Sequence, residues 1–140
     1  MKNIPLLIAL ITFFTGILYY LLFREPTLLT TSIGIRSFSL GVNPLLGWFP
    51  SFVHQLSFIL LSWLAVDRQY PWQILFTWLT INIVFEIGQG LDQVYFINFP
   101  HVLQLYFQRG TYSHSDILAI CIATVVAYII MNKYTKKELS

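Results

Sequence analysis

Twenty consecutive residues near the start of the chain, from Ile4 to Phe23, carry no charged side chain. At about 1.5 Å per residue, a helix of this length is about 30 Å long and matches the hydrocarbon core of a bilayer. Pro5 suits a first helical turn, and Pro26 suits an exit from the helix. The stretch is too long for the apolar region of a secretory signal, and no A-x-A-like cleavage site follows it. We therefore expect an uncleaved transmembrane helix.

The composition extends this expectation to the whole chain. Of 140 residues, 56% are hydrophobic and 10% are charged, and the mean hydropathy is +0.68. A water-soluble domain of this size cannot bury so much apolar surface. The sequence therefore predicts an all-α integral membrane bundle of about four transmembrane helices, in a single domain that covers residues 1–140. The predicted spans are residues 4–23, 50–66, 72–90 and 115–131.

Two segments are too polar or too broken to cross a bilayer. Residues 24–47 contain a Thr-Thr-Ser run, several glycines and the turn-forming pair Asn43-Pro44. Residues 91–112 are rich in aromatic side chains and are interrupted by Pro100. We expect both segments to lie in the membrane interface.

Several classes of function are excluded by what the sequence lacks. The net charge is only +2 and most basic residues are scattered singly, so no nucleic-acid surface is expected. Cys121 is the one cysteine, which excludes an internal disulfide, and its apolar surroundings predict a buried packing role. The histidines and carboxylates have no zinc spacing, and no phosphate-loop or dinucleotide-binding motif is present. We therefore expect no metal and no cofactor.

The basic residues indicate how the bundle is oriented. In a four-span topology, five of them fall on one side: Lys2, Arg68, Lys133, Lys136 and Lys137. Three fall on the other side: Arg24, Arg36 and Arg109. Because cytoplasmic loops carry an excess of lysine and arginine, both termini are expected in the cytoplasm. Membrane lipids are the expected partners, with the tail lysines against anionic headgroups. An oligomer is left open, and no small-x-x-x-small motif is taken to mark an interface.

Polar residues gather at one depth when the predicted spans are laid antiparallel. They lie near the start of the second span, in the last turns of the third, at the start of the fourth and on the connecting segment. The six are His54, Glu86, Gln89, Arg109, His114 and Asp116. A charge in lipid costs roughly 2.5 to 3.5 kcal/mol, so such residues usually face a partner or a cavity. The sequence predicts that they form a polar cluster that binds a ligand on the extracytoplasmic side.

The third span carries a polar stripe. Asn82, Glu86, Gln89 and Gln93 recur at intervals that place them on one helix face, and this face is expected to point into the bundle. For Asn82 and Gln93 we favour hydrogen bonds that hold neighbouring helices together. For Glu86 we favour a functional role, because a carboxylate in a membrane is costly.

Structural and functional readings stay open for the other polar residues. Arg109 either forms a salt bridge with Glu86 or binds an anionic group of a ligand. The spacing of Ser113 and Asp116 resembles a capping box, in which the two residues satisfy each other's backbone amides at a helix start. His54 and His114 either transfer protons or hydrogen-bond a neighbour, whereas His101 is expected to be an interfacial anchor.

Two segments of the chain resemble the VanZ-like membrane proteins. The first is Phe85-Glu86-Ile87-Gly88-Gln89, and the second runs from Arg109 through Asp116-Ile117 to Ala119. The E-x-x-Q, arginine and aspartate-isoleucine elements of the family map onto these residues. The segment 50–54 is similar to a histidine-bearing helix start in related members, and the resemblance covers roughly residues 44–130. A second acidic residue that many members carry is replaced here by Ser113.

The resemblance implies a bacterial cytoplasmic membrane protein linked to glycopeptide resistance and envelope processes. We expect binding of an amphipathic envelope ligand or a glycopeptide-type antibiotic, with Arg109 on an anionic group. Trp48, Phe52 and the aromatic residues of 95–107 would hold the apolar part. One alternative is a membrane enzyme acting on a lipid-linked substrate, with Glu86 or Asp116 as base and a histidine as proton carrier. The other is a non-catalytic partner subunit.

Overall fold

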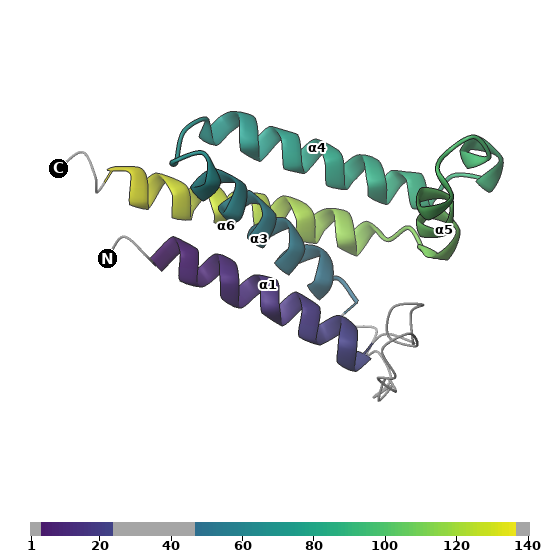
Figure 1. Cartoon of the computed structure of the whole chain (residues 1–140), viewed down its shortest axis with the longest axis horizontal. Helices are drawn as coiled ribbons and strands as arrows, with labels where there is room; N and C mark the ends of the chain where they lie inside the picture. Colours follow the sequence, from purple (N-terminus) through teal and green to yellow (C-terminus); the bar gives the residue numbers. More distant parts are fainter. Residues whose placement is uncertain (1–3, 24–46, 137–140) are drawn as a thin grey trace.

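The computed structural model of the protein describes residues 4–23 and 47–136, and every regular element in these ranges is a helix. This confirms the predicted all-α class. Figure 1 shows α1, α3, α4 and α6 side by side, with a short helix, α5, at one end. The elements are α1 (Ile4–Phe23), α3 (Phe49–Ala65), α4 (Pro71–Gln89), the 3-10 helix η2 (Gln93–Phe96), α5 (His101–Arg109) and α6 (His114–Lys136).

Prolines mark the helix starts. Pro50 and Pro71 occupy the first turns of α3 and α4, where a missing N–H costs nothing, and Pro100 directly precedes α5. Helix α6 continues to Lys136, five residues beyond the predicted span. Segment 91–112, predicted to be interfacial, contains η2 and α5. Helix α5 packs against α4, and η2 packs against α5.

Some predictions fall on residues outside the described ranges. The segment 24–47 lies outside them except for Gly47, and so do Lys2 and Lys137. The side chains of Arg109, Gln93 and Lys136 are also outside the described part of the chain. The orientation count and the pairing of Arg109 with Glu86 therefore stay predictions.

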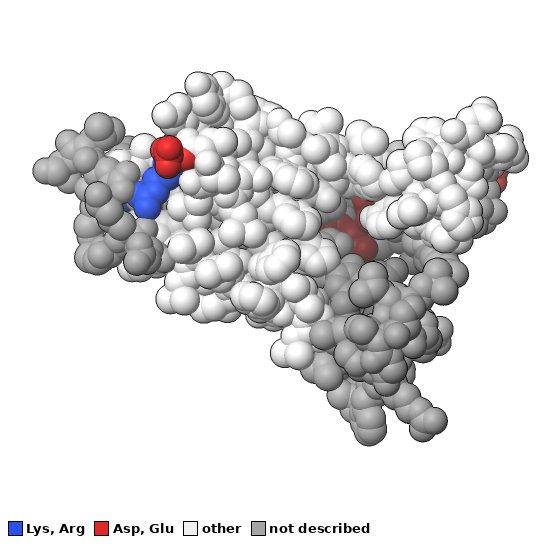
Figure 2. All heavy atoms as spheres, in the orientation of Figure 1, with Lys and Arg blue, Asp and Glu red and all other residues white. Residues whose placement is uncertain are grey.

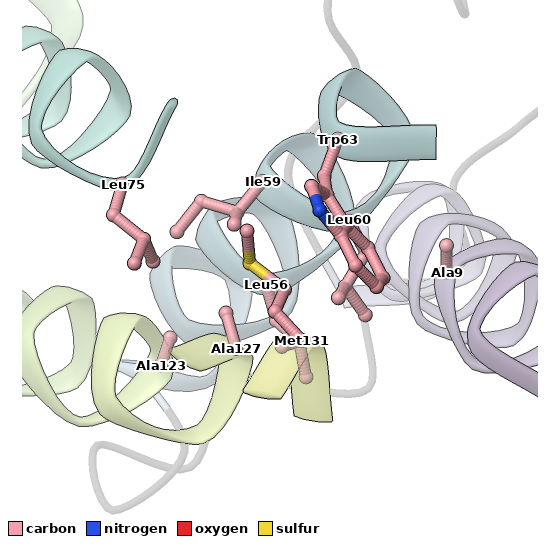
Figure 3. Close-up of a cluster of buried hydrophobic side chains, with 9 residues drawn as sticks. All are labelled: Ala9, Leu56, Ile59, Leu60, Trp63, Leu75, Ala123, Ala127 and Met131. Atoms are coloured by element: carbon pink, nitrogen blue, oxygen red, sulfur yellow. The ribbon is translucent and has the colours of Figure 1, made fainter. Parts of the chain in front are cut away.

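Helix α3 is the centre of the bundle, because it packs against α1, α4 and α6. Figure 3 shows the buried cluster that results, with Trp63, Leu60, Ile59 and Leu56 projecting from α3. Leu75 of α4 and Ala9 of α1 complete two of its sides.

A row of small side chains lets α6 approach α3 closely. Ala119, Ala123 and Ala127 recur every four residues on α6 and are all buried, and the last two lie in the cluster around α3. Small residues at this spacing allow the backbones of neighbouring helices to come together. This motif joins two helices within the chain, and the expectation that none marks an interface with another copy stays a prediction.

The chain reverses direction at each end of the bundle. In Figure 1, the start of α1, the turn between α3 and α4, and the end of α6 lie at one end, while α5 and the start of α6 lie at the other. Within the described residues, α6 is long and apolar enough over His114–Thr135 to cross a membrane, and shorter apolar helices cover Ile4–Tyr19 and Phe49–Ala65. This length and composition support membrane association.

Candidate functional site

Glu86 connects the end of α4 to the start of α6. Its side chain is 6% exposed, and its Oε1 accepts a hydrogen bond of 2.8 Å from the backbone N–H of Ser113. The carbonyl of Ser113 accepts hydrogen bonds from the amides of Asp116 and Ile117, so Ser113 is the residue that caps α6. A carboxylate at this position also meets the positive end of the helix dipole. Glu86, which lies on a neighbouring helix, thus helps to cap the start of α6.

The capping box predicted for Ser113 and Asp116 was wrong. In a capping box, the serine hydroxyl binds the amide three residues on, and the acidic side chain returns to the serine amide. Here the Ser113 hydroxyl lies 2.6 Å from the Ser115 hydroxyl, and Glu86 takes the Ser113 amide. Glu86 of the neighbouring α4 thus takes the place of Asp116 as acceptor of the Ser113 amide, which leaves the Asp116 carboxyl available for other contacts.

Asp116 lies in the first turn of α6 and faces α3. The Ser51 side chain of α3 forms a hydrogen bond with its carboxyl group, and the charge of Asp116 acts on the Glu86 carboxyl group. Oδ1 of Asp116 is buried and has no hydrogen-bond partner among the described residues. Ser51, Glu86, Ser113 and Asp116 therefore form one group from three helices, which we call the acidic cluster. Figure 2 shows acidic atoms recessed at the end of the bundle where α4 meets α6.

Two other predicted site residues lie near the same end of the bundle. Gln89 donates a 2.8 Å hydrogen bond to the Tyr106 hydroxyl and so ties α5 to α4. Gly110 has no Cβ, which leaves room for the Gln89 side chain. His114 begins α6 and lies 2.9 Å, through Nδ1, from the Tyr112 hydroxyl, where both side chains are exposed.

His54 lies one turn after Ser51 on α3 and contacts both its own helix and α1. It stacks on Phe58 of its own helix at 5.8 Å between ring centroids. A Cβ placed on Gly16 of α1 would lie 3.1 Å from its ring, so the glycine lets α1 approach it closely.

A buried polar network that the sequence did not reveal crosses three helices farther along the bundle. Gln55 of α3 is fully buried, accepts a hydrogen bond from the Asn82 amide and donates one of 2.8 Å to Thr124 of α6. Such bonds hold membrane helices together at about 0.6 kcal/mol each, with a maximum near 1.7. The predicted bridging role of Asn82 is confirmed, whereas Gln55 and Thr124 were missed.

Cys121 does not have the predicted buried role, because its side chain is exposed on α6. An apolar helix sequence marks residues that avoid water but does not say which of them face a neighbouring helix. Among the described residues, no group of three or more histidine, cysteine, aspartate or glutamate side chains could hold a metal ion.

Comparison of the chain with protein-family models, with curated proteins and with solved structures gives no match.

Proposed function

We propose that the protein is a VanZ-like bundle of four transmembrane helices, whose acidic cluster binds the polar end of an amphipathic envelope ligand on the extracytoplasmic side. The spans would be α1, α3, α4 and α6, with 20, 17, 19 and 23 residues. These lengths lie within the roughly 17–25 residues that cross a bilayer.

Large apolar side chains on the outer faces of the helices support the membrane part of the proposal. On α1, Leu7, Ile11, Phe14 and Leu18 are all more than half exposed and recur every three or four residues. Helix α6 has a similar row that includes Ile122 and Ile129. Contiguous apolar faces of this extent are costly in water and are the normal surface toward lipid.

The arrangement of the helix ends supports the orientation. The start of α1 and the end of α6 lie at one end of the bundle, opposite α5 and the acidic cluster (Figure 1). With the basic tail of α6 in the cytoplasm, the acidic cluster faces the extracytoplasmic side.

The observation that carries the binding proposal is the buried Oδ1 of Asp116, which has no hydrogen-bond partner among the described residues. Buried polar atoms nearly always have a partner, and a buried carboxylate oxygen without one favours a donor supplied by a ligand. The ligand group would be an ammonium or a hydroxyl, while Arg109 is proposed to meet an anionic group of the same molecule. Glycopeptide-type antibiotics are the first ligand to test because of the resemblance to VanZ-like proteins.

A second candidate, a membrane enzyme acting on a lipid-linked substrate, is favoured by the interaction of the Glu86 and Asp116 carboxyl groups. Two carboxyl groups close together can serve as general acid and base. If the protein is such an enzyme, removing the charge of a carboxyl group would abolish turnover while the substrate still binds. If it is a passive partner subunit, the same change would lower only its assembly.

Expression in a glycopeptide-susceptible bacterial host tests the proposal. We expect wild type to raise the inhibitory concentration of a glycopeptide or lipoglycopeptide. Asp116→Asn should bind the ligand about tenfold more weakly, because a charged hydrogen bond is worth about 1.5 kcal/mol or more. The substitution keeps the size of the side chain and an acceptor for Ser51.

Asp92→Asn is the matched control, because Asp92 is an exposed aspartate that lies just after α4. All variants are compared at equal membrane abundance. If wild type confers no tolerance, the glycopeptide role is wrong. If Asp116→Asn protects as well as Asp92→Asn, the acidic cluster does not bind the antibiotic.

A further inference from the structure

An apolar groove lies between the end of α4 and the two short elements that follow it. Its volume is about 300 Å³, and all nine residues that line it are apolar. Phe96, Phe99 and Phe107 form one wall, where Phe96 and Phe107 stack with ring centroids 4.2 Å apart. Phe85 stacks on Phe107 from α4 at 5.6 Å, which fixes the wall against the bundle.

We propose that this groove holds one hydrocarbon chain of a membrane amphipath. The inference rests on the proposed function, which places the bundle in a bilayer, and it names the apolar half of the ligand whose polar half would lie at the acidic cluster. The groove and the acidic cluster lie at the same end of α4, since Gly88 lines the first and Glu86 belongs to the second.

The lining selects a hydrocarbon occupant. A peptide or headgroup in the groove would leave its polar groups without hydrogen bonds, at roughly 1–3 kcal/mol each. A dry cavity of about 150 Å³ holds one benzene molecule, so by proportion this groove holds a chain segment of about twelve carbons.

The groove opens onto the surface that would face lipid in the proposed topology. Val84, Ile87 and Leu91 line it, and they are 58%, 46% and 50% exposed. Phe76 lies farther along the same outer face of α4 and is also exposed. A lipid chain can therefore enter sideways from the bilayer without crossing a polar surface.

Two positions allow the groove to be altered. Leu103 of α5 lines it, so Leu103→Trp should fill it. Val102, the adjacent residue, is 77% exposed and does not line it, which makes Val102→Trp the matched control. Gly88→Ala offers an independent change, because the new Cβ would lie 2.5 Å from the Phe107 ring and displace it.

The test uses the full chain in phosphatidylcholine and phosphatidylglycerol vesicles that contain a phosphatidylglycerol with a diazirine in one acyl chain. After illumination, mass spectrometry maps the adducts. We expect several-fold more adducts per exposed area on Phe96, Phe99 and Leu103 than on Ile11 and Phe14 of α1. Leu103→Trp should lower the signal at Phe96 and Phe99 several-fold, while Val102→Trp leaves it unchanged.

The outcomes separate this inference from the proposed function. If α1 and α6 are labelled but the wild-type groove is labelled no more than they are, or if both tryptophan variants behave alike, the lipid groove is wrong and the membrane bundle stands. If the outer faces of α1 and α6 take up no label, the bundle is not embedded in the bilayer and the proposed function fails with it. The ratio of labelling in the groove to labelling on α1 in the wild-type protein decides between these outcomes without any variant. Poor folding of Leu103→Trp therefore cannot mask the answer.

Discussion

Trp63→Ala is expected to lower the free energy of unfolding by about 3–5 kcal/mol, the largest change in stability from a single substitution that the fold predicts. Trp63 is fully buried on α3, the helix that packs against α1, α4 and α6, and Figure 3 shows it within the central cluster. The guanidinium of Arg68 lies 5.6 Å from the centre of its ring. Removing the indole leaves a large cavity that the neighbouring helices can close only in part.

Unfolding in detergent micelles, followed by circular dichroism, measures this loss. Trp72→Ala is the control, because Trp72 is 55% exposed on α4. Trp63→Phe should cost about 1 kcal/mol, since it keeps most of the ring volume and removes an Nε1–H that has no partner among the described residues. Equal losses for Trp63→Ala and Trp72→Ala would contradict the central position of α3.

Glu86 is expected to separate folding from function through two substitutions. Glu86→Leu removes the acceptor of the Ser113 amide and should lower the free energy of unfolding by about 1–3 kcal/mol. Glu86→Gln keeps an oxygen at the same place, so we expect it to retain most of the stability while losing the negative charge that the proposed ligand site requires.

Hydrogen exchange at the Ser113 amide reports the contact directly. Exchange should be slow in wild type and Glu86→Gln and fast in Glu86→Leu. Gln89→Leu is the control, because Gln89 lies on the same helix as Glu86. The substitution breaks the hydrogen bond from Gln89 to Tyr106 of α5 and leaves the Ser113 contact intact. Equal protection of the amide in the Leu and Gln variants would show that Glu86 does not close the start of α6.

The positions of the helices could be predicted because local features set them. Uncharged apolar runs end at charged or glycine-rich turns, and Pro50 and Pro71 sit in first turns as their missing N–H allows. The polar residues at the ends of α4 and α6 could likewise be assigned to one end of the bundle, because antiparallel helices of similar length place those ends together.

Contacts between helices could not be predicted in the same way. Gln55 pairs with Asn82 and Thr124 only because of how three helices are rotated about their axes, which an apolar sequence leaves undetermined. The same uncertainty explains Cys121, which faces outward from an apolar helix. The capping box failed for a related reason, because the local pattern at Ser113 takes no account of an acceptor from α4.

Cysteine accessibility in intact cells tests the central claim most directly, namely that a membrane bundle presents the acidic cluster to the outside. In a Cys121→Ser background, a cysteine is placed at Thr111, beside the cluster, or at Asn132, near the opposite end, since both residues are exposed. We predict that an impermeant maleimide labels Thr111→Cys in intact cells and labels Asn132→Cys only after the cells are broken. Labelling of Asn132→Cys but not Thr111→Cys in intact cells would contradict the orientation, and labelling of neither or both in intact cells would contradict the membrane bundle.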